Sequence, residues 1–152
     1  MRFPISVVVA AGIVAISATL MLVRAQESDM RATVDKPATV PISNRTNENG
    51  RVTAGERPRL VLTIIGFEPS PDGPVEIVVN VRCGGADREI GRFAIYPYVA
   101  FSASDPSRVQ RFGFNLPNDL ACDRPRSAMV HLVPGSGDGK GASILIGRAS
   151  LE

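Results

Sequence analysis

Cys83 and Cys122 are the only cysteines of this 152-residue chain and carry its most reactive side chains. In an oxidising compartment, an even pair of this kind usually forms a structural disulfide. A redox pair or a metal site is the alternative, but two thiols far apart in the sequence, with no second pair, make a poor zinc site. We therefore expect a bridge between Cys83 and Cys122, worth roughly 4 kcal/mol on the chain-entropy model.

His131 is the only histidine and lies in the strand-like run Met129 to Val133. Alternation places it on the face opposite Val130 and Leu132. A catalytic base needs an orienting partner and a nucleophile within reach, and a lone histidine on a strand is more often a packed or half-exposed side chain. We therefore expect no catalytic role for His131.

The glycine-rich segment 134–141 has the composition of a phosphate-binding loop but not its pattern. A Walker loop follows a parallel strand, ends in Gly-Lys-Ser/Thr and leads into a helix. Here Lys140 is followed by a glycine and then by a strand-like run. We expect a flexible hairpin connection. The sequence also contains no Gly-x-Ser-x-Gly elbow and no outstanding pair of carboxylates, so it favours a protein that is not an enzyme and needs no metal or cofactor.

Both tyrosines of the chain, Tyr96 and Tyr98, lie with Phe101 in one short segment between strand-like runs. Aromatic side chains on a loop held by a rigid sheet are good interface anchors, because they bury a large area at a small cost in entropy. The alternative is that these rings only cap the open end of the domain. The sequence leaves both interpretations open.

The first 25 residues have the pattern of a signal peptide. A basic start at Arg2 precedes the apolar run Ile5 to Val23, and small residues stand at Val23 and Ala25, where signal peptidase needs them. The alternative is an uncleaved anchor, because the run approaches the roughly 20 residues that span a bilayer. In both cases the rest of the chain is expected in the periplasm or outside the cell, with membrane contact only if the segment stays uncleaved.

The charge of the exported part argues against nucleic-acid binding. Removing Arg2 and Arg24 lowers the 17 basic residues to 15, which equals the 15 acidic residues. Nucleic-acid binding needs clustered positive charge, and here single arginines are interspersed with other residues. We therefore expect no nucleic-acid partner.

Residues 26–58 are predicted to form a flexible leader, because they are polar, rich in Asn, Thr and Pro, and show no sustained apolar period. Within this leader, Ala38 to Ile42 could add an edge strand. Pro37 and Pro41 limit it to an edge or argue against any strand, since proline cannot donate a hydrogen bond to a neighbouring strand.

Residues 59–152 read as short strands separated by Gly and Pro turns. The runs with this pattern are 60–65, 75–81, 90–96, 109–116, 128–133 and 144–151. Regular short strands without helical periodicity predict an all-β domain, an antiparallel β-sandwich of six to seven strands. Its inner faces are expected to include Leu60, Leu62, Ile64, Ile77, Val79, Phe93, Phe112, Phe114, Val130, Leu132, Ile144 and Ile146.

The order of these strand motifs carries a family resemblance over residues 59–152. The motifs are Arg59–Pro69, Val75–Val81, Ile90–Phe93, Arg111–Leu116, Val130–Pro134 and Ile144–Leu151. The series resembles the β-sandwich domain that follows the catalytic domain in bacterial tyrosinases and plant polyphenol oxidases. The family's catalytic domain is a helical bundle whose six histidines hold two copper ions, and one histidine cannot provide such a site.

The resemblance implies a companion role, because in that family the sandwich domain covers the entrance of the copper domain and can push a bulky side chain toward the metals. Tyr96, Tyr98 and Phe101 are the candidates for such a side chain here. Two hypotheses follow: an exported accessory or shielding domain for a tyrosinase-like copper enzyme, or a generic binding or structural module of the envelope with no link to copper.

Overall fold

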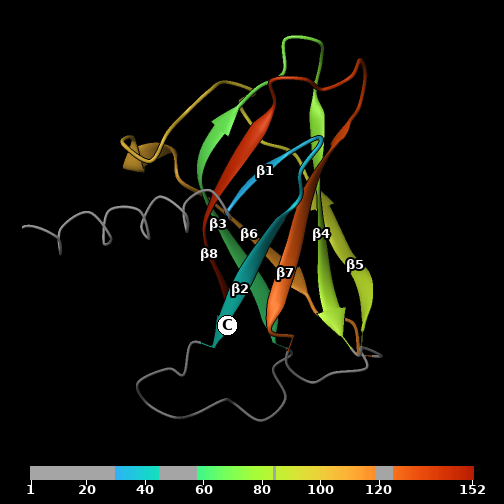
Figure 1. Cartoon of the computed structure of the whole chain (residues 1–152). Helices are drawn as coiled ribbons and strands as arrows, with labels where there is room; N and C mark the ends of the chain where they lie inside the picture. The colour runs from blue at the N-terminus through green and yellow to red at the C-terminus, as the bar shows by residue number, and fades with distance from the viewer. Residues whose placement is uncertain (1–29, 45–57, 84, 119–124) are drawn as a thin grey trace, which may run out of the picture.

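The computed structural model describes residues 30–44, 58–83, 85–118 and 125–152, and this part of the chain is all-β (Figure 1). The predicted signal peptide, residues 45–57 of the predicted leader, and Cys122 lie outside the described residues. Within the described ranges, no helix is long and apolar enough to cross a membrane. The elements are β1 (Arg31–Thr33), β2 (Ala38–Asn44), β3 (Arg59–Glu68), β4 (Val75–Cys83), β5 (Ala86–Phe93), the 3-10 turn η1 (Pro106–Arg108), β6 (Gln110–Asn115), β7 (Ser127–Pro134) and β8 (Ser143–Leu151).

The strands form one curled mixed sheet in the order β5-β4-β7-β2-β8-β3-β6, with β1 beside β8 (Figure 1). The pairs are antiparallel except for β2 and β8, which run parallel. The all-β prediction is confirmed. The predicted arrangement of antiparallel strands is corrected, because the sheet contains a parallel pair and curls into a half-barrel around its core.

β2 corrects the prediction that residues 26–58 are a flexible leader. Its first part, Ala38 to Pro41, pairs antiparallel with β7, and its last part, Ile42 to Asn44, pairs parallel with β8. It is therefore an internal strand and not the edge strand that its prolines suggested. Pro41 is tolerated because it stands where the strand leaves β7 for β8, so its missing N–H removes little from either ladder.

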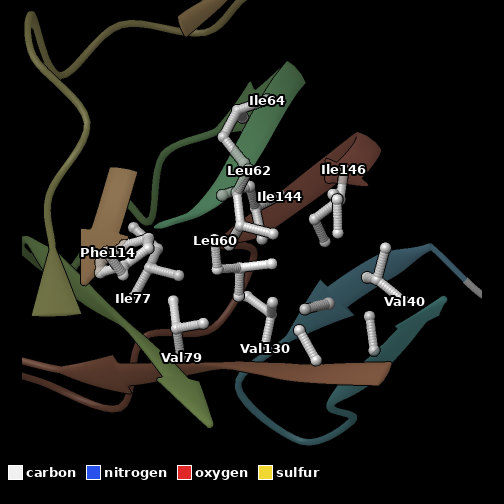
Figure 2. Packing of buried hydrophobic residues seen from close by; sticks show 14 of the residues in the cluster. Val40, Leu60, Leu62, Ile64, Ile77, Val79, Phe114, Val130, Ile144 and Ile146 are labelled. Atoms are coloured by element: carbon white, nitrogen blue, oxygen red, sulfur yellow. The ribbon is translucent and has the colours of Figure 1, made fainter. Parts of the chain in front are cut away.

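The predicted core is confirmed in large part, because period-two alternation places large apolar residues of β3, β4, β7 and β8 on the inner face (Figure 2). Of the expected residues, Phe93 and Phe112 are only half-buried and pack against the cluster from its margin. The core also contains Ala32, Ala38 and Val40 from β1 and β2, which the sequence did not predict.

The two edge strands of the described sheet, β5 and β6, meet through aromatic side chains. The rings of Phe93 and Phe112 stack with centroids 3.9 Å apart, and Phe114 lies 5.9 Å from Phe93. A Cβ atom at Gly91 would lie 2.6 Å from the ring of Phe114, so glycine is needed for this close approach. We call this contact the aromatic seam. β5 ends at Phe93, earlier than the predicted run 90–96, and the chain then continues as a loop.

Candidate functional site

The loop between β5 and β6, residues 94–109, carries the most exposed large apolar side chains of the described chain. Tyr96 is 87% exposed and Val99 is 51% exposed. Residues 94–104 carry no charge, although charged residues make up 21% of the whole sequence. Residues 94–104 therefore present an uncharged, largely apolar surface, and we call residues 94–104 the Tyr96 loop.

Tyr98 fixes the Tyr96 loop to the neighbouring turn between β3 and β4. Its hydroxyl donates a hydrogen bond to the backbone oxygen of Gly73 at 2.8 Å and accepts one from the backbone N–H of Ser70 at 3.1 Å. Its ring meets Phe67 edge-on, with centroids 5.3 Å apart. Because the hydroxyl forms hydrogen bonds with both a donor and an acceptor of the other loop, Tyr98 holds the two loops together, and we call it a structural brace.

Phe101 anchors the other side of the loop and is itself buried, with 7% of its surface exposed. Its backbone N–H and C=O both bond to Phe67, at 3.0 and 2.9 Å. The guanidinium of Arg108 lies 5.6 Å from the ring centroid of Phe101, and one of its nitrogens donates to the backbone oxygen of Ala100 at 3.0 Å. Phe101 therefore cannot serve as an exposed anchor in this structure.

Of the three predicted partner-facing residues, only Tyr96 presents its side chain to solvent. Its backbone oxygen accepts a hydrogen bond from the side-chain amide of Gln110 at 3.1 Å, and its peptide bond to Pro97 is cis. Val99 was not predicted, because an apolar residue in a loop can pack inward or outward with no local signal to distinguish the two. The structure thus divides the predicted site into two braces, Tyr98 and Phe101, and one exposed ring.

We expect Tyr98→Phe to lower the free energy of unfolding by about 1–2 kcal/mol, because it leaves the Ser70 N–H and the Gly73 carbonyl without their partner. Urea denaturation of wild type and variant measures the effect. Tyr96→Phe is the matched control, since it removes a hydroxyl from a fully presented ring and should stay within about 0.5 kcal/mol of wild type. Equal effects of the two substitutions would show that Tyr98 does not hold the loop.

The glycine-rich segment 134–141 is not a hairpin, because β7 and β8 are separated by β2 in the sheet. The segment instead passes over the turn between β1 and β2. Gly139 has a φ of 67°, and a Cβ atom there would lie 2.8 Å from Val34. Lys140 pairs with Asp138 at 2.7 Å, so its ammonium group is engaged within the loop itself.

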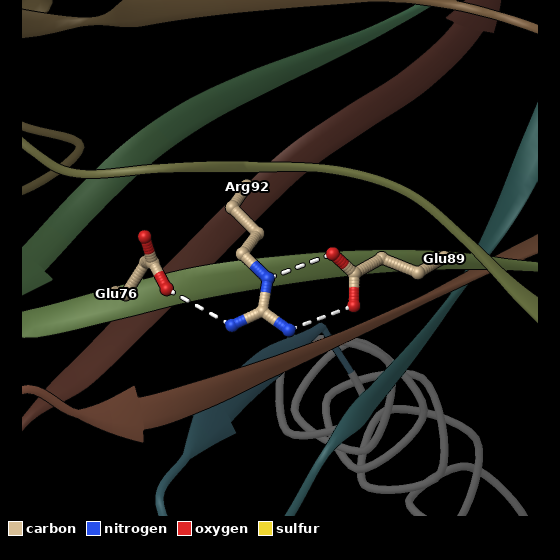
Figure 3. A network of polar contacts seen from close by, with 3 residues as sticks. All are labelled: Glu76, Glu89 and Arg92. Atoms are coloured by element: carbon tan, nitrogen blue, oxygen red, sulfur yellow. Dashed lines mark hydrogen bonds and ion pairs between the residues drawn. The ribbon is translucent and has the colours of Figure 1, made fainter.

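His131 lies half-buried on β7, opposite Val78 of β4 on the outer face of the sheet. Charged residues of the neighbouring strands share this face (Figure 3). Arg92 contacts Glu89 through two hydrogen bonds of 2.7 and 2.9 Å and Glu76 through one of 3.1 Å. The hydrogen bonds from Arg92 hold the pKa of Glu89 below its usual range. In the described ranges, no three His, Cys, Asp or Glu side chains are grouped so that they could hold a metal ion.

The exposed charges of β5 have a structural consequence. Arg82 and Asp87 form a two-bond ion pair of 2.7 and 2.8 Å across the β4–β5 hairpin, next to the group around Arg92. Exposed ion pairs contribute little to stability. Charged side chains on an edge strand do, however, discourage pairing with the edge of another molecule. The charged outer face of β4 and β5 is therefore better suited to contact with water than to contact with an apolar surface.

Cys83 is buried at the end of β4. Cys122 lies outside the described residues, so the bridge between the two remains a prediction.

Comparison with protein-family models, with curated proteins and with solved structures finds no match for this chain. The fold and the site therefore define it only as an all-β domain with a braced, uncharged aromatic loop. None of these comparisons links the chain to the tyrosinase domain, so that resemblance rests only on the order of the strand motifs in the sequence.

Proposed function

We propose that this protein is an exported, non-catalytic binding module that uses Tyr96 and Val99 of the Tyr96 loop to contact a partner protein. The observation that carries the proposal is the exposure of Tyr96 on a loop that is fixed from both sides. Exposed apolar side chains that are grouped, as Tyr96 and Val99 are on this loop, are a feature of interaction sites.

The bracing of the loop supports binding because it lowers the entropic cost of association. Tyr98 and Phe101 tie the loop to the β3–β4 region, so Tyr96 is already held close to one position before a partner arrives. A pre-organised aromatic side chain loses little conformational freedom on binding. An uncharged patch also avoids the desolvation of charged groups, which favours an apolar or neutral partner surface.

The specific role as an accessory domain of a tyrosinase-like copper enzyme is the narrower form of the proposal. It rests on the resemblance of the strand order, and it needs one bulky side chain directed away from the domain. Tyr96 meets that need, whereas Tyr98 and Phe101 are engaged inside the domain. In this view the strands β5-β4-β7 and β8-β3-β6 correspond to the two sheets of a sandwich, linked by β2. The alternative is an envelope module with no copper partner.

We expect Tyr96→Ala to weaken partner binding by about tenfold or more, because truncating an aromatic anchor typically costs over 1 kcal/mol. The measurement is site-specific photo-crosslinking in intact cells from position 99, with a crosslinker at Ser136 as the control on another loop. Tyr96→Ala should abolish the discrete adduct formed from position 99, and Tyr96→Phe, which keeps the ring, should retain most of it.

The narrower copper-oxidase role is tested by mixing the purified protein with a tyrosinase-like catalytic domain from the same organism. Association at micromolar concentration, or a changed rate of phenol oxidation that Tyr96→Ala removes, would support it. If neither occurs while the adduct from position 99 persists, the partner belongs to another class. If position 99 gives no more adduct than Ser136, the binding proposal itself is wrong.

A further inference from the structure

A hollow of about 270 Å³ lies where β5 leaves β4. The last register pair of these two strands is Ile77 with Phe93. On its other side, β4 stays paired with β7 as far as Val75 and Pro134. The chain after Phe93 therefore turns away from the first residues of β4. We call the space left there the β4 hollow, and residues 74–76, 94 and 133–135 line it.

The β4 hollow is held in shape by contacts within the domain. The backbone N–H of Gly135 donates to the backbone oxygen of Pro74 at 2.8 Å and so ties the β7–β8 loop to the β3–β4 turn. Tyr98 fixes the same turn through its hydrogen bond to Gly73. Proline at positions 74 and 134 restricts the backbone further, because the ring fixes φ. A ligand that enters the β4 hollow therefore needs little ordering of the protein.

The β4 hollow adjoins the Tyr96 side chain. Ile95 is 3% exposed, whereas Ala94 and Tyr96 on either side of it are exposed. This alternation of burial is that of an extended segment, in which residues two apart point to the same side and lie about 7 Å from each other. One segment of a partner can therefore contact the Tyr96 ring and the β4 hollow together.

The walls of the β4 hollow suit an apolar side chain. They are built from proline, valine, alanine and glycine, and among the described residues that line the hollow only Glu76 is charged. The volume lies below the roughly 300–1,000 Å³ of pockets for drug-sized ligands. The hollow therefore has room for one side chain and not for a large cofactor.

Glu76 adds a preference for positive charge. One of its carboxylate oxygens accepts a hydrogen bond from Arg92 at 3.1 Å, and the other accepts none from the described residues (Figure 3). Arg92 also pairs with Glu89, so these three side chains keep one net negative charge. The Glu76 side chain is 48% exposed, and residues 66–81 hold three acidic residues and no basic one. A basic group of a partner therefore meets unlike charge at this place.

We propose that the β4 hollow binds an apolar side chain of the partner that Tyr96 contacts, and that an arginine or lysine beside this side chain pairs with Glu76. The inference rests on the proposed function and adds the chemistry of the partner segment. An acidic segment would place like charges next to Glu76, so the same carboxylate that attracts a basic segment rejects an acidic one.

The test titrates the isotope-labelled protein with two short peptides that differ only in charge. Both carry a central pair of leucines, flanked by arginines in one peptide and by glutamates in the other. We expect the arginine peptide to shift the amide NMR signals of Ala94 and Gly135. It should bind at least about fivefold more tightly than the glutamate peptide, because unlike charge beside Glu76 favours one and like charge disfavours the other.

Two pairs of variants separate charge from space. Glu76→Lys should remove the preference for the arginine peptide, whereas Asp87→Lys makes the same change of charge in the ion pair with Arg82, away from the hollow, and should keep it. Ala94→Phe should fill the hollow and weaken binding of the arginine peptide by about fivefold or more. Ala86→Phe, at the exposed start of β5, should leave that binding unchanged.

The proposal is overturned if millimolar arginine peptide leaves the signals of Ala94 and Gly135 unmoved, or if the two peptides bind equally well. Equal effects of Glu76→Lys and Asp87→Lys would also overturn it. The crosslink from position 99 is read independently of these titrations. If that adduct persists while the titrations fail, Tyr96 binds its partner without the β4 hollow, and the proposed function stands.

Discussion

Phe114→Ala is expected to lower the free energy of unfolding by about 3–5 kcal/mol, the usual range for truncating a buried phenylalanine. Phe114 is 9% exposed, covers Gly91 of β5 and lies 5.9 Å from Phe93. Its removal takes one ring out of the aromatic seam between the edge strands, where side chains and not ladder hydrogen bonds make the contact, and leaves the stacked pair of Phe93 and Phe112. Loss of this ring therefore removes core packing and weakens the seam.

Thermal or urea unfolding followed by far-ultraviolet circular dichroism measures this loss. Asn115→Ala is the control, because Asn115 is the next residue on the same strand and points into solvent. It should change stability by less than about 0.5 kcal/mol. A loss below about 1 kcal/mol for Phe114→Ala would show that Phe114 is not packed in the core in solution.

The strands of residues 59–152 could be predicted because their signal is local. In β3, alternate apolar residues such as Leu60, Leu62 and Ile64 must face one side of any sheet, and turn residues mark where the strand stops. The outcome confirms this for most of the core. The closure of the sheet was harder to predict, since it depends on which edges meet, and no local pattern shows that Phe112 would stack on Phe93.

β2 could not be predicted for a different reason. Its burial uses alanine and valine, which are too small to produce a strong apolar period, and Pro41 argues against an internal strand when read locally. The change of neighbour from β7 to β8 removes that objection, but it exists only in the folded sheet. The roles of Tyr98 and Phe101 were hidden in the same way, because their partners belong to the β3–β4 region.

The internal position of β2 leads to the second large effect. We expect Val40→Asp to lower the free energy of unfolding at neutral pH by roughly 3–5 kcal/mol, because it places a carboxylate with no partner charge in the core. Val40 is 1% exposed and belongs to the same cluster as Val130 and Ile146. Thr39→Asp is the matched control, since Thr39 is adjacent on the same strand and exposed. It should cost well under half as much.

The pH dependence of the Val40→Asp variant provides an independent check with a defined sign. Burial raises the pKa of the introduced carboxyl in the folded state above its unfolded value of about 4. Protonation then favours the folded state, so the variant should be closest to wild type below about pH 4 and lose stability as the pH rises. Urea unfolding of wild type and both variants at pH 4 and pH 7 measures this. If Val40→Asp and Thr39→Asp behave alike at both pH values, residues 38–44 do not lie inside the sheet, and the original description of this segment as a leader is restored.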